Sequence, residues 1–276
     1  MTVPDETLDL LRASASLVPK EMRADWDELV RRTIADVWDR PVLPARQRSI
    51  ITIAGLATLV LPTELRTQVR LARVNGMSRL EICEVVMQIA GYTGAARAIE
   101  AMQVLREVFE EEGDDAAEPI SQSHSWPALE GRHDRARVTI NKLQPHQGDV
   151  IHGHAVEYEV EGGPARTPLS PTYGWLGWIH DNAFGDLWFR PHLTDDERER
   201  ATTAALVVLG LGDELVGHFQ ANLSFGFTPE EIGEGIVQLA PYTGYPTTVH
   251  AMLLARQVID TFTPPPERPS LDADRG

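Results

Sequence analysis

DLWFRPHLTDDERER (residues 186–200) begins the stretch that decides the fold, and DELVGHFQANLSFGFTPEEIGEGIVQLAPYTGYP (213–246) forms its centre. Residues 36–110 align with residues 186–260 at one constant offset and without a gap. Identity reaches roughly one position in three, more than chance gives over this length. The aligned identities include Asp36/Asp186, Trp38/Trp188, Arg40/Arg190, Pro41/Pro191, Arg48/Arg198, Glu84/Glu234, Gln88/Gln238 and the tripeptides at 92–94 and 242–244. The chain is therefore a tandem repeat of one structural unit.

Helical periodicity runs through both copies. Apolar residues at steps of three and four predict amphipathic helices over residues 4–17 and about 21–37. The segment ARQRSIITIAGLATLVL (45–61) is apolar on nearly all sides after Arg48, which predicts a buried helix. Three more helices should follow, the first capped by Thr63, the second opened by a capping box of Ser78 and Glu81, and the third spanning 95–112. These patterns predict an all-α fold of two helical repeats related by pseudo-two-fold symmetry.

The composition changes between the copies, where Ser, Pro, Gly and His become more frequent. Within this insert, GDVIHGHAVEYEVEGG (148–163) alternates in the manner of a strand, and ARVTINKL (136–143) is the partner that we expect for it in a small β-hairpin. The expected organisation is a first repeat with N-terminal helices at 1–112, an insert at 113–171, a second repeat at 172–264 and a flexible tail at 265–276. The β structure should be confined to the insert.

Composition limits the classes of function. The 276 residues, 42% of them hydrophobic, are enough for one large or two ordinary domains. No apolar run reaches membrane-spanning length, and the N-terminus lacks the features of a secretory signal, so we expect a cytoplasmic protein. A net charge of -16 argues against nucleic acid and anionic membranes as partners. The single Cys83 cannot form an internal disulfide or a Cys-x-x-Cys pair.

The most informative position is one where the copies differ. Where the first copy has Gln68, the second has His218, and all nine histidines lie between His124 and His250. A glutamate precedes each by four residues, Glu64 in the first copy and Glu214 in the second. This spacing puts both side chains on one helical face, where a carboxylate can orient an imidazole for general acid or base catalysis. A solvated surface pair or a hydrogen-bonded core histidine is the structural alternative.

The order of motifs resembles the carboxymuconolactone decarboxylase family, whose wider group includes the alkyl-hydroperoxidase D proteins. The resemblance rests on the RPxL turn, the buried helix, and EIxExxxQxAxYTG, which occurs at 81–94 and again at 231–244. It implies an all-helical, oligomeric protein with its active site among these helices. A homo-oligomer, such as a dimer or trimer of two-repeat chains, follows as an expectation.

The peroxidase branch of that group uses a glutamate, a Cys-x-x-Cys pair and a histidine. Transferred to this chain, the histidine falls at His218, the glutamate at Glu199, and the cysteines at Leu211 and Glu214. The corresponding positions of the first repeat are Gln68, Ser49, Leu61 and Glu64. Both copies lack both cysteines, which excludes the peroxidase reaction. The resemblance therefore implies one catalytic and one degenerate repeat.

The decarboxylase branch lacks these cysteines, keeps the histidine, and needs no metal or organic cofactor. By this resemblance His218 would protonate the carbanion left by loss of carbon dioxide. Glu214 would orient the imidazole, and Glu199 would relay or remove a proton. Arg190 or Arg198 would hold a substrate carboxylate through two parallel hydrogen bonds. Because both arginines have counterparts in the first repeat, structural salt bridges to acidic residues are an equally good interpretation.

Two other histidine-bearing segments remain candidates. His180, Asp181 and Asn182 precede the second repeat without a counterpart in the first, and either line the pocket or cap a helix. His152 and His154 point the same way if their segment is a strand, but no third ligand at diagnostic spacing accompanies them, so no metal is expected.

The leading hypothesis is a cofactor-independent decarboxylase acting on a small carboxylated substrate, with lactones among the candidates. An isomerase, cyclase or hydrolase using the same His/Glu site is the first alternative, and a non-catalytic binding or assembly protein is the second.

Overall fold

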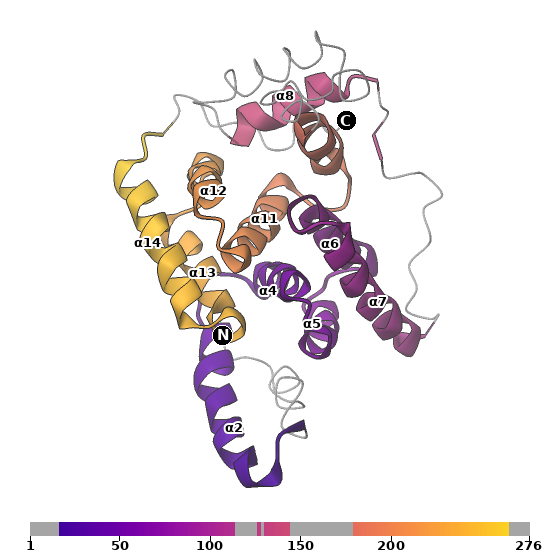
Figure 1. The fold of residues 1–276 in the computed structure, drawn as a ribbon, viewed down its shortest axis with the longest axis vertical. Helices are drawn as coiled ribbons and strands as arrows, with labels where there is room; N and C mark the ends of the chain where they lie inside the picture. The colour runs from indigo at the N-terminus through magenta and orange to yellow at the C-terminus, as the bar shows by residue number, and fades with distance from the viewer. Residues whose placement is uncertain (1–16, 114–125, 128–129, 144–178, 265–276) are drawn as a thin grey trace.

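The computed structural model describes residues 17–113, 126–127, 130–143 and 179–264, and these contain helices and turns but no strand (Figure 1). The first repeat consists of α4 (Ala45–Leu59), α5 (Pro62–Val74), α6 (Arg79–Thr93) and α7 (Ala95–Glu112). The second consists of α11 (Asp195–Leu209), α12 (Gly212–Phe225), α13 (Pro229–Thr243) and α14 (Tyr245–Thr261). Helix follows helix in the same order in both copies, which confirms the all-α tandem prediction.

Local sequence explains where most of these helices begin. Ser78 and Glu81 form the predicted capping box at α6, and Thr228 with Glu231 forms its counterpart at α13. The predicted cap at Thr63 is wrong, because α5 already begins at Pro62. A proline suits the first helical position, where its fixed φ is helical and its missing N–H would have no helical partner.

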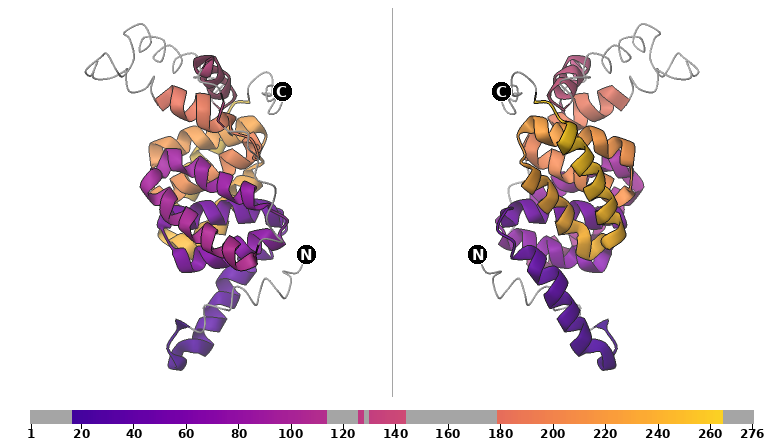
Figure 2. Two further views of the ribbon diagram at one scale, coloured as in Figure 1. Left: turned by 90° about the vertical axis from the view of Figure 1, so that its right-hand side faces the viewer. Right: turned by 90° about the vertical axis from the view of Figure 1, so that its left-hand side faces the viewer.

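Shorter helical segments precede each repeat. In the first copy η2 (Lys20–Met22), α2 (Arg23–Val30), the π-helical η3 (Arg31–Ala35) and α3 (Asp36–Trp38) form a nearly continuous rod, as predicted for 21–37. In the second copy the π-helical η5 (His180–Asp186) leads into η6 (Leu187–Phe189). Figure 2 shows α2 projecting from the helical body at the end opposite α8 (Arg132–Leu143).

The strand predicted for 136–143 is wrong, since these residues belong to α8. Ala136, Ile140 and Leu143 are its buried apolar side chains, and their spacing of four and three is the period of a helix. They pack α8 against η5 and α12. The other predicted strand and the helix predicted at 4–17 lie outside the described residues.

The core joins the two repeats. Helices α4 and α11 pack against each other at the centre, and each also contacts α6 and α13 (Figure 1). One cluster of buried apolar side chains runs from Leu43 to Val258 and draws on both copies. The repeats therefore share a core, rather than folding around separate ones.

Polar contacts across the centre occur in reciprocal pairs. Arg190 of the second copy donates to Glu84 of the first, and Arg40 of the first donates to Glu234 of the second. The same exchange relates the remaining pairs, which are Arg198 to Gln88 and Arg48 to Gln238, Gln88 to Thr202 and Gln238 to Thr52, and Trp188 to Tyr92 and Trp38 to Tyr242. Each patch meets the equivalent patch of the other copy, as in a two-fold symmetric dimer.

Candidate functional site

The site centres on a hydrogen bond between two helices of the second repeat. His218, on α12, places Nδ1 2.9 Å from Oε1 and 3.0 Å from Oε2 of Glu199, on α11. Glu199 is fully buried, whereas the His218 side chain keeps 12% of its surface exposed. A buried carboxylate thus fixes an imidazole that remains accessible at one edge.

A second polar contact lies one helical turn further along the same two helices. Thr203 donates from its hydroxyl to Oε1 of Glu199 at 3.2 Å, and Asn222 donates from Nδ2 to the Thr203 hydroxyl at 3.3 Å. Thr203 follows Glu199 by four positions and Asn222 follows His218 by four, so the pairs stack on facing helical surfaces. The Thr203 hydroxyl thus gives Oε1 of Glu199 a second donor besides Nδ1 of His218.

The first repeat contributes an aromatic side chain to this site. Tyr92, from α6, lies edge-on to His218, with the ring centroids 5.8 Å apart and the planes at 79°. Its hydroxyl accepts a hydrogen bond from Nε1 of Trp188 at 2.9 Å. Burial raises the pKa of Tyr92, and the charge of Glu199 raises it further. Tyr92 is therefore an uncharged wall of the site at physiological pH.

The tautomer of His218 follows from its partner. A carboxylate only accepts hydrogen bonds, so Nδ1 must carry a proton, and Nε2 is the nitrogen left for chemistry. Nε2 makes no hydrogen bond to any residue that the structure describes. When neutral, His218 can accept a proton at Nε2, and when protonated it can donate one from there.

Glu214 does not occupy the orienting position predicted for it. Glu214 is exposed, and the carboxylate hydrogen-bonded to His218 is that of Glu199. The i, i+4 spacing placed Glu214 on the correct helix, but Nδ1 turns inward, where α11 packs. The carboxylate in contact with the imidazole is thus that of Glu199, a residue distant from the histidine along the chain.

The two arginines proposed to hold a substrate carboxylate instead tie the repeats together. Arg190 donates from Nε to Glu84 at 3.0 Å, and its guanidinium lies 4.6 Å from the ring centroid of Trp126. Arg198 is fully buried and donates to Gln88 at 2.9 Å and to the carbonyl of Pro191 at 2.9 Å. These internal partners favour the salt-bridge alternative, and a role of either arginine in substrate binding stays a prediction.

The segment at 180–182 begins the π-helix η5, which packs against α8. Asp181 is buried and Asn182 is partly buried, while the side chain of His180 lies outside the described residues. The role of all three in a pocket stays a prediction. The segment containing His152 and His154 is also outside the description, and the described residues include no cluster of three or more potential metal ligands.

The equivalent site in the first repeat is closed. Gln68 and Ser49 are both fully buried. Gln68 donates weakly to the hydroxyl of Tyr242 at 3.4 Å, and Ser49 accepts from Asn75 at 2.9 Å. Neither Gln68 nor Ser49 titrates near neutral pH, so this half keeps the architecture of the site without a proton carrier.

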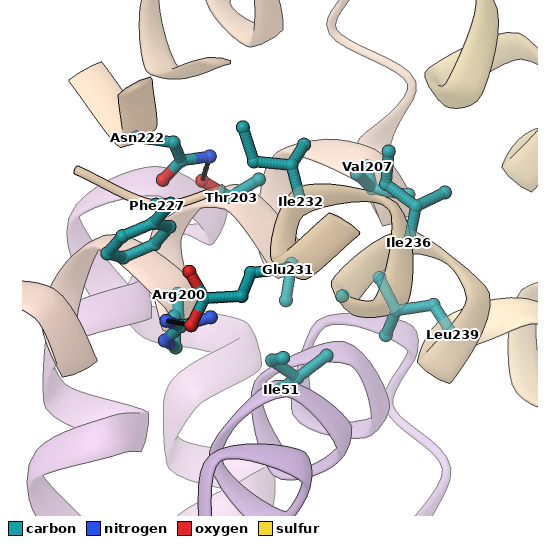
Figure 3. Close-up of a pocket in the computed structure, with 12 residues that line it drawn as sticks. Ile51, Arg200, Thr203, Val207, Asn222, Phe227, Glu231, Ile232, Ile236 and Leu239 are labelled. Carbon is teal, nitrogen blue, oxygen red and sulfur yellow. Dashed lines mark hydrogen bonds and ion pairs between the residues drawn. The ribbon is translucent and has the colours of Figure 1, made fainter. Parts of the chain in front are cut away.

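A small cavity of about 30 Å³ has Thr203 and Asn222 in its wall. Figure 3 shows Asn222 and Thr203 together on one side, and Arg200 paired with Glu231 beside Phe227. Apolar side chains complete the wall; they are Ile51, Val207, Ile232, Ile236 and Leu239. The cavity thus borders the Thr203–Asn222 contact, whereas His218 and Glu199 are not among its lining residues.

Sequence reasoning missed Tyr92, Thr203 and Asn222. Tyr92 recurs as Tyr242 in the other copy, and nothing in a linear sequence places it across a repeat boundary. Thr203 and Asn222 could have been found, since each lies four residues beyond a site residue on the same helix.

No described helix is both long enough and apolar enough to cross a bilayer.

Comparison with known proteins agrees with this architecture. The carboxymuconolactone decarboxylase family matches residues 24–107 and 175–257, more than half of the chain. A 4-carboxymuconolactone decarboxylase of Acinetobacter baylyi is 36% identical over 90 residues, which are 33% of this chain and 67% of the relative. A nitrosuccinic acid decarboxylase of Metarhizium robertsii is 38% identical over 73 residues, 26% of this chain and 51% of that relative. This chain is a tandem member of the carboxymuconolactone decarboxylase family.

Proposed function

We propose that the protein is a cofactor-independent decarboxylase of a small carboxylated substrate, with His218 as the general acid. The observation that carries the proposal is the bond from Nδ1 of His218 to the buried Glu199, which leaves Nε2 for proton transfer. The decarboxylase names of two relatives from different organisms support the reaction type.

The proposed reaction breaks the bond between the substrate and its carboxylate. Carbon dioxide leaves, and the bonding electrons move into a conjugated acceptor, such as the carbonyl of a lactone. Nε2 of protonated His218 then donates its proton to the carbon that lost the carboxylate. A proton from water restores the imidazolium. General acids placed in this way typically contribute about a hundredfold to ten-thousandfold in rate.

Glu199 and Tyr92 would act through His218. The Glu199 carboxylate balances the positive charge of the imidazolium and fixes the ring through Nδ1. The Tyr92 edge limits rotation of the ring. Neither residue needs to touch the substrate, so we assign positioning roles to both.

Proton transfer without loss of carbon dioxide is the second candidate, in an isomerase, cyclase or hydrolase. The internal contacts of Arg190 and Arg198 favour retaining it, because the two arginines expected to recognise a carboxylate already have structural partners. A non-catalytic binding role is the third.

We also propose a cytoplasmic homo-oligomer. Exposed apolar residues on α14 support oligomerisation, namely Tyr245, Val249 and Leu253, and light scattering would test it.

The test is carbon dioxide release by the full chain from 4-carboxymuconolactone, nitrosuccinate and a panel of carboxylated lactones. Release with at least one compound, lost in His218→Gln, supports the proposal. Turnover without carbon dioxide would indicate the second candidate, and no turnover or binding across the panel would indicate the third.

Metal removal provides a separate prediction. Because the proposed proton transfer uses only side chains, activity should stay within about twofold after dialysis against EDTA. Turnover measured before and after dialysis checks this. Activity that is lost and then restored by a divalent cation would contradict the cofactor-independent mechanism and direct attention to His152 and His154.

A further inference from the structure

The cavity bordered by Thr203 and Asn222 is lined mainly by residues of the second repeat. In the second repeat its polar and open walls are formed by Arg200, Thr203, Asn222 and Gly235. The equivalent positions of the first repeat are Ile50, Ile53, Ala72 and Val85, all of them 0% exposed in the core. Two polar side chains have apolar branched counterparts, and a glycine replaces a valine. The positions that give this cavity its polar wall and its open space in the second repeat are therefore apolar in the first, with Val85 in the place of Gly235 and Ala72 in the place of Asn222.

The cavity contains a hydrogen-bond acceptor without a donor. Asn222 is only 2% exposed, and its Oδ1 has no hydrogen-bond partner in the part of the chain that the structure describes. Its Nδ2 is already used by the Thr203 hydroxyl, which fixes the orientation of the amide. A buried acceptor without a partner is costly, and the cost disappears when a ligand supplies a donor.

Charge and size restrict what can bind there. Arg200 is 3.1 Å from Asp196 and 3.4 Å from Glu231, so its charge is already balanced. A carboxylate in the cavity would face Oδ1 of Asn222 and the Glu231 carboxylate, and both would repel it. A volume of about 30 Å³ holds one small group, and the remaining walls are mostly apolar. The site therefore suits a short, uncharged substituent with one hydrogen-bond donor.

We propose that this cavity is a specificity subsite for a hydroxyl group of the substrate, which donates to Asn222 Oδ1 while the neighbouring part of the same molecule reacts at His218. This proposal rests on the proposed function for the reaction at His218. Recognition of the hydroxyl by Asn222 does not depend on which reaction occurs there. His218 and Asn222 lie one helical turn apart on α12, a distance that a small substrate spans. A nitro group offers only acceptors, so the preferred substrate would differ from nitrosuccinate in this substituent.

Binding of three acids that differ at one position tests the proposal without requiring turnover. The probes are malate, 2-methylsuccinate and succinate, titrated calorimetrically into the full chain. We expect malate to bind about tenfold more tightly than 2-methylsuccinate, because a buried acceptor discriminates against a ligand that lacks the donor. Equal binding of the three acids, or no binding of malate, would overturn the subsite.

Two variants test separately the Asn222 acceptor and the volume of the cavity. Asn222→Ala introduces the residue of the first repeat and removes the acceptor, so malate should lose its advantage. Gly235→Val fills the cavity while keeping Asn222; the first added carbon would lie 3.6 Å from Ile51 Cδ1, an ordinary contact. Malate should then bind like succinate. Persistence of the malate preference in both folded variants would overturn the proposal.

A crystal structure of the malate complex distinguishes the ligand hydroxyl from solvent. The hydroxyl should lie within hydrogen-bond distance of Asn222 Oδ1, whereas a water retained there beside bound malate would contradict the subsite. His218→Gln should keep the malate preference, since binding needs no proton transfer. If that preference holds but no substrate releases carbon dioxide, the proposed function fails and the subsite stands. If a substrate releases carbon dioxide but malate binds no more tightly than 2-methylsuccinate, the proposed function stands and the subsite fails.

Discussion

The two repeats are alike where they contact each other and differ where the second carries its His/Glu pair. Arg40 and Arg190, with Glu234 and Glu84 as their partners, make the same exchange in both directions. The Glu199/His218 pair, in contrast, corresponds to a serine and a glutamine in the first repeat. Residues identical in both copies therefore maintain the scaffold, and the positions that differ are the ones to examine for chemistry.

A smaller difference shows that even the shared contacts are not equally buried. The Arg190 side chain is 8% exposed and stacks on Trp126, which lies outside both repeats. The Arg40 side chain is 48% exposed. The same ion pair is thus shielded from water on the side of the second repeat and hydrated on the side of the first.

The largest effect among positioning residues should come from Glu199→Gln. The amide can still accept from Nδ1 of His218, but it cannot balance the imidazolium charge, so turnover should fall on the order of a hundredfold. Steady-state kinetics against Ser49→Ala, the matched change in the first repeat, measures the difference. Ser49→Ala and the exposed Glu214→Gln should each stay within a few fold. Equal losses in the three variants would show that Glu199 has no special role.

The shared ion pairs should differ in stability in proportion to their burial. Glu84→Gln leaves the buried Arg190 without a carboxylate and should cost about 3–5 kcal/mol of unfolding free energy. Glu234→Gln should cost less, because water hydrates much of Arg40. Urea unfolding of both variants provides the comparison. A larger loss in Glu234→Gln would contradict the burial argument.

Acid should remove the contribution of Glu234 to the free energy of unfolding. Burial alone would raise its pKa, but hydrogen bonds from Arg40 and Arg48 and their charges outweigh it, and the pKa is lowered overall. Because the pKa of Glu234 is lower in the folded than in the unfolded protein, its ionised carboxylate stabilises the fold at pH values above the unfolded pKa of about 4.3. This stabilisation is lost as the pH falls through the folded pKa. The difference in unfolding free energy between wild type and Glu234→Gln should therefore be full at pH 7 and begin to shrink as the pH falls below about 4.3.

A smaller effect should follow removal of the aromatic wall. Tyr92→Leu eliminates the ring beside His218 and the acceptor for Trp188, so we expect kcat to fall about tenfold with little change in KM. Tyr242→Leu makes the matched change beside Gln68 and should leave kcat nearly unchanged. Tyr92→Phe keeps the ring and should recover most of the loss. A similar kcat loss in Tyr242→Leu would indicate a purely structural role for both tyrosines.

Much of this architecture could be predicted from the sequence, because helical periodicity and the internal repeat are properties of the linear chain. The boundaries of α7 and the capping box of α6 are set by local residues and agree with prediction. The prediction of a strand at 136–143 failed, because eight residues are too few to distinguish the helical from the strand period of apolar residues without tertiary contacts.

The site could be predicted only in part, and burial is the reason. His218 was found by comparing the two copies and Glu199 by resemblance, and the structure brings them together. The contribution of Tyr92 depends on packing between repeats, and the roles of Arg190 and Arg198 depend on which acceptors meet them in the core. None of these contacts is encoded by spacing along one helix.

The most direct test of one working and one degenerate repeat is the turnover of His218→Gln against that of Gln68→Ala. Glutamine keeps similar length and hydrogen bonding but carries no proton near neutral pH. His218→Gln should lower turnover on the order of a hundred to ten thousand fold with little change in stability, and Gln68→Ala should stay within a few fold. Equal losses in the two variants, or nearly full activity in a folded His218→Gln protein, would contradict the account.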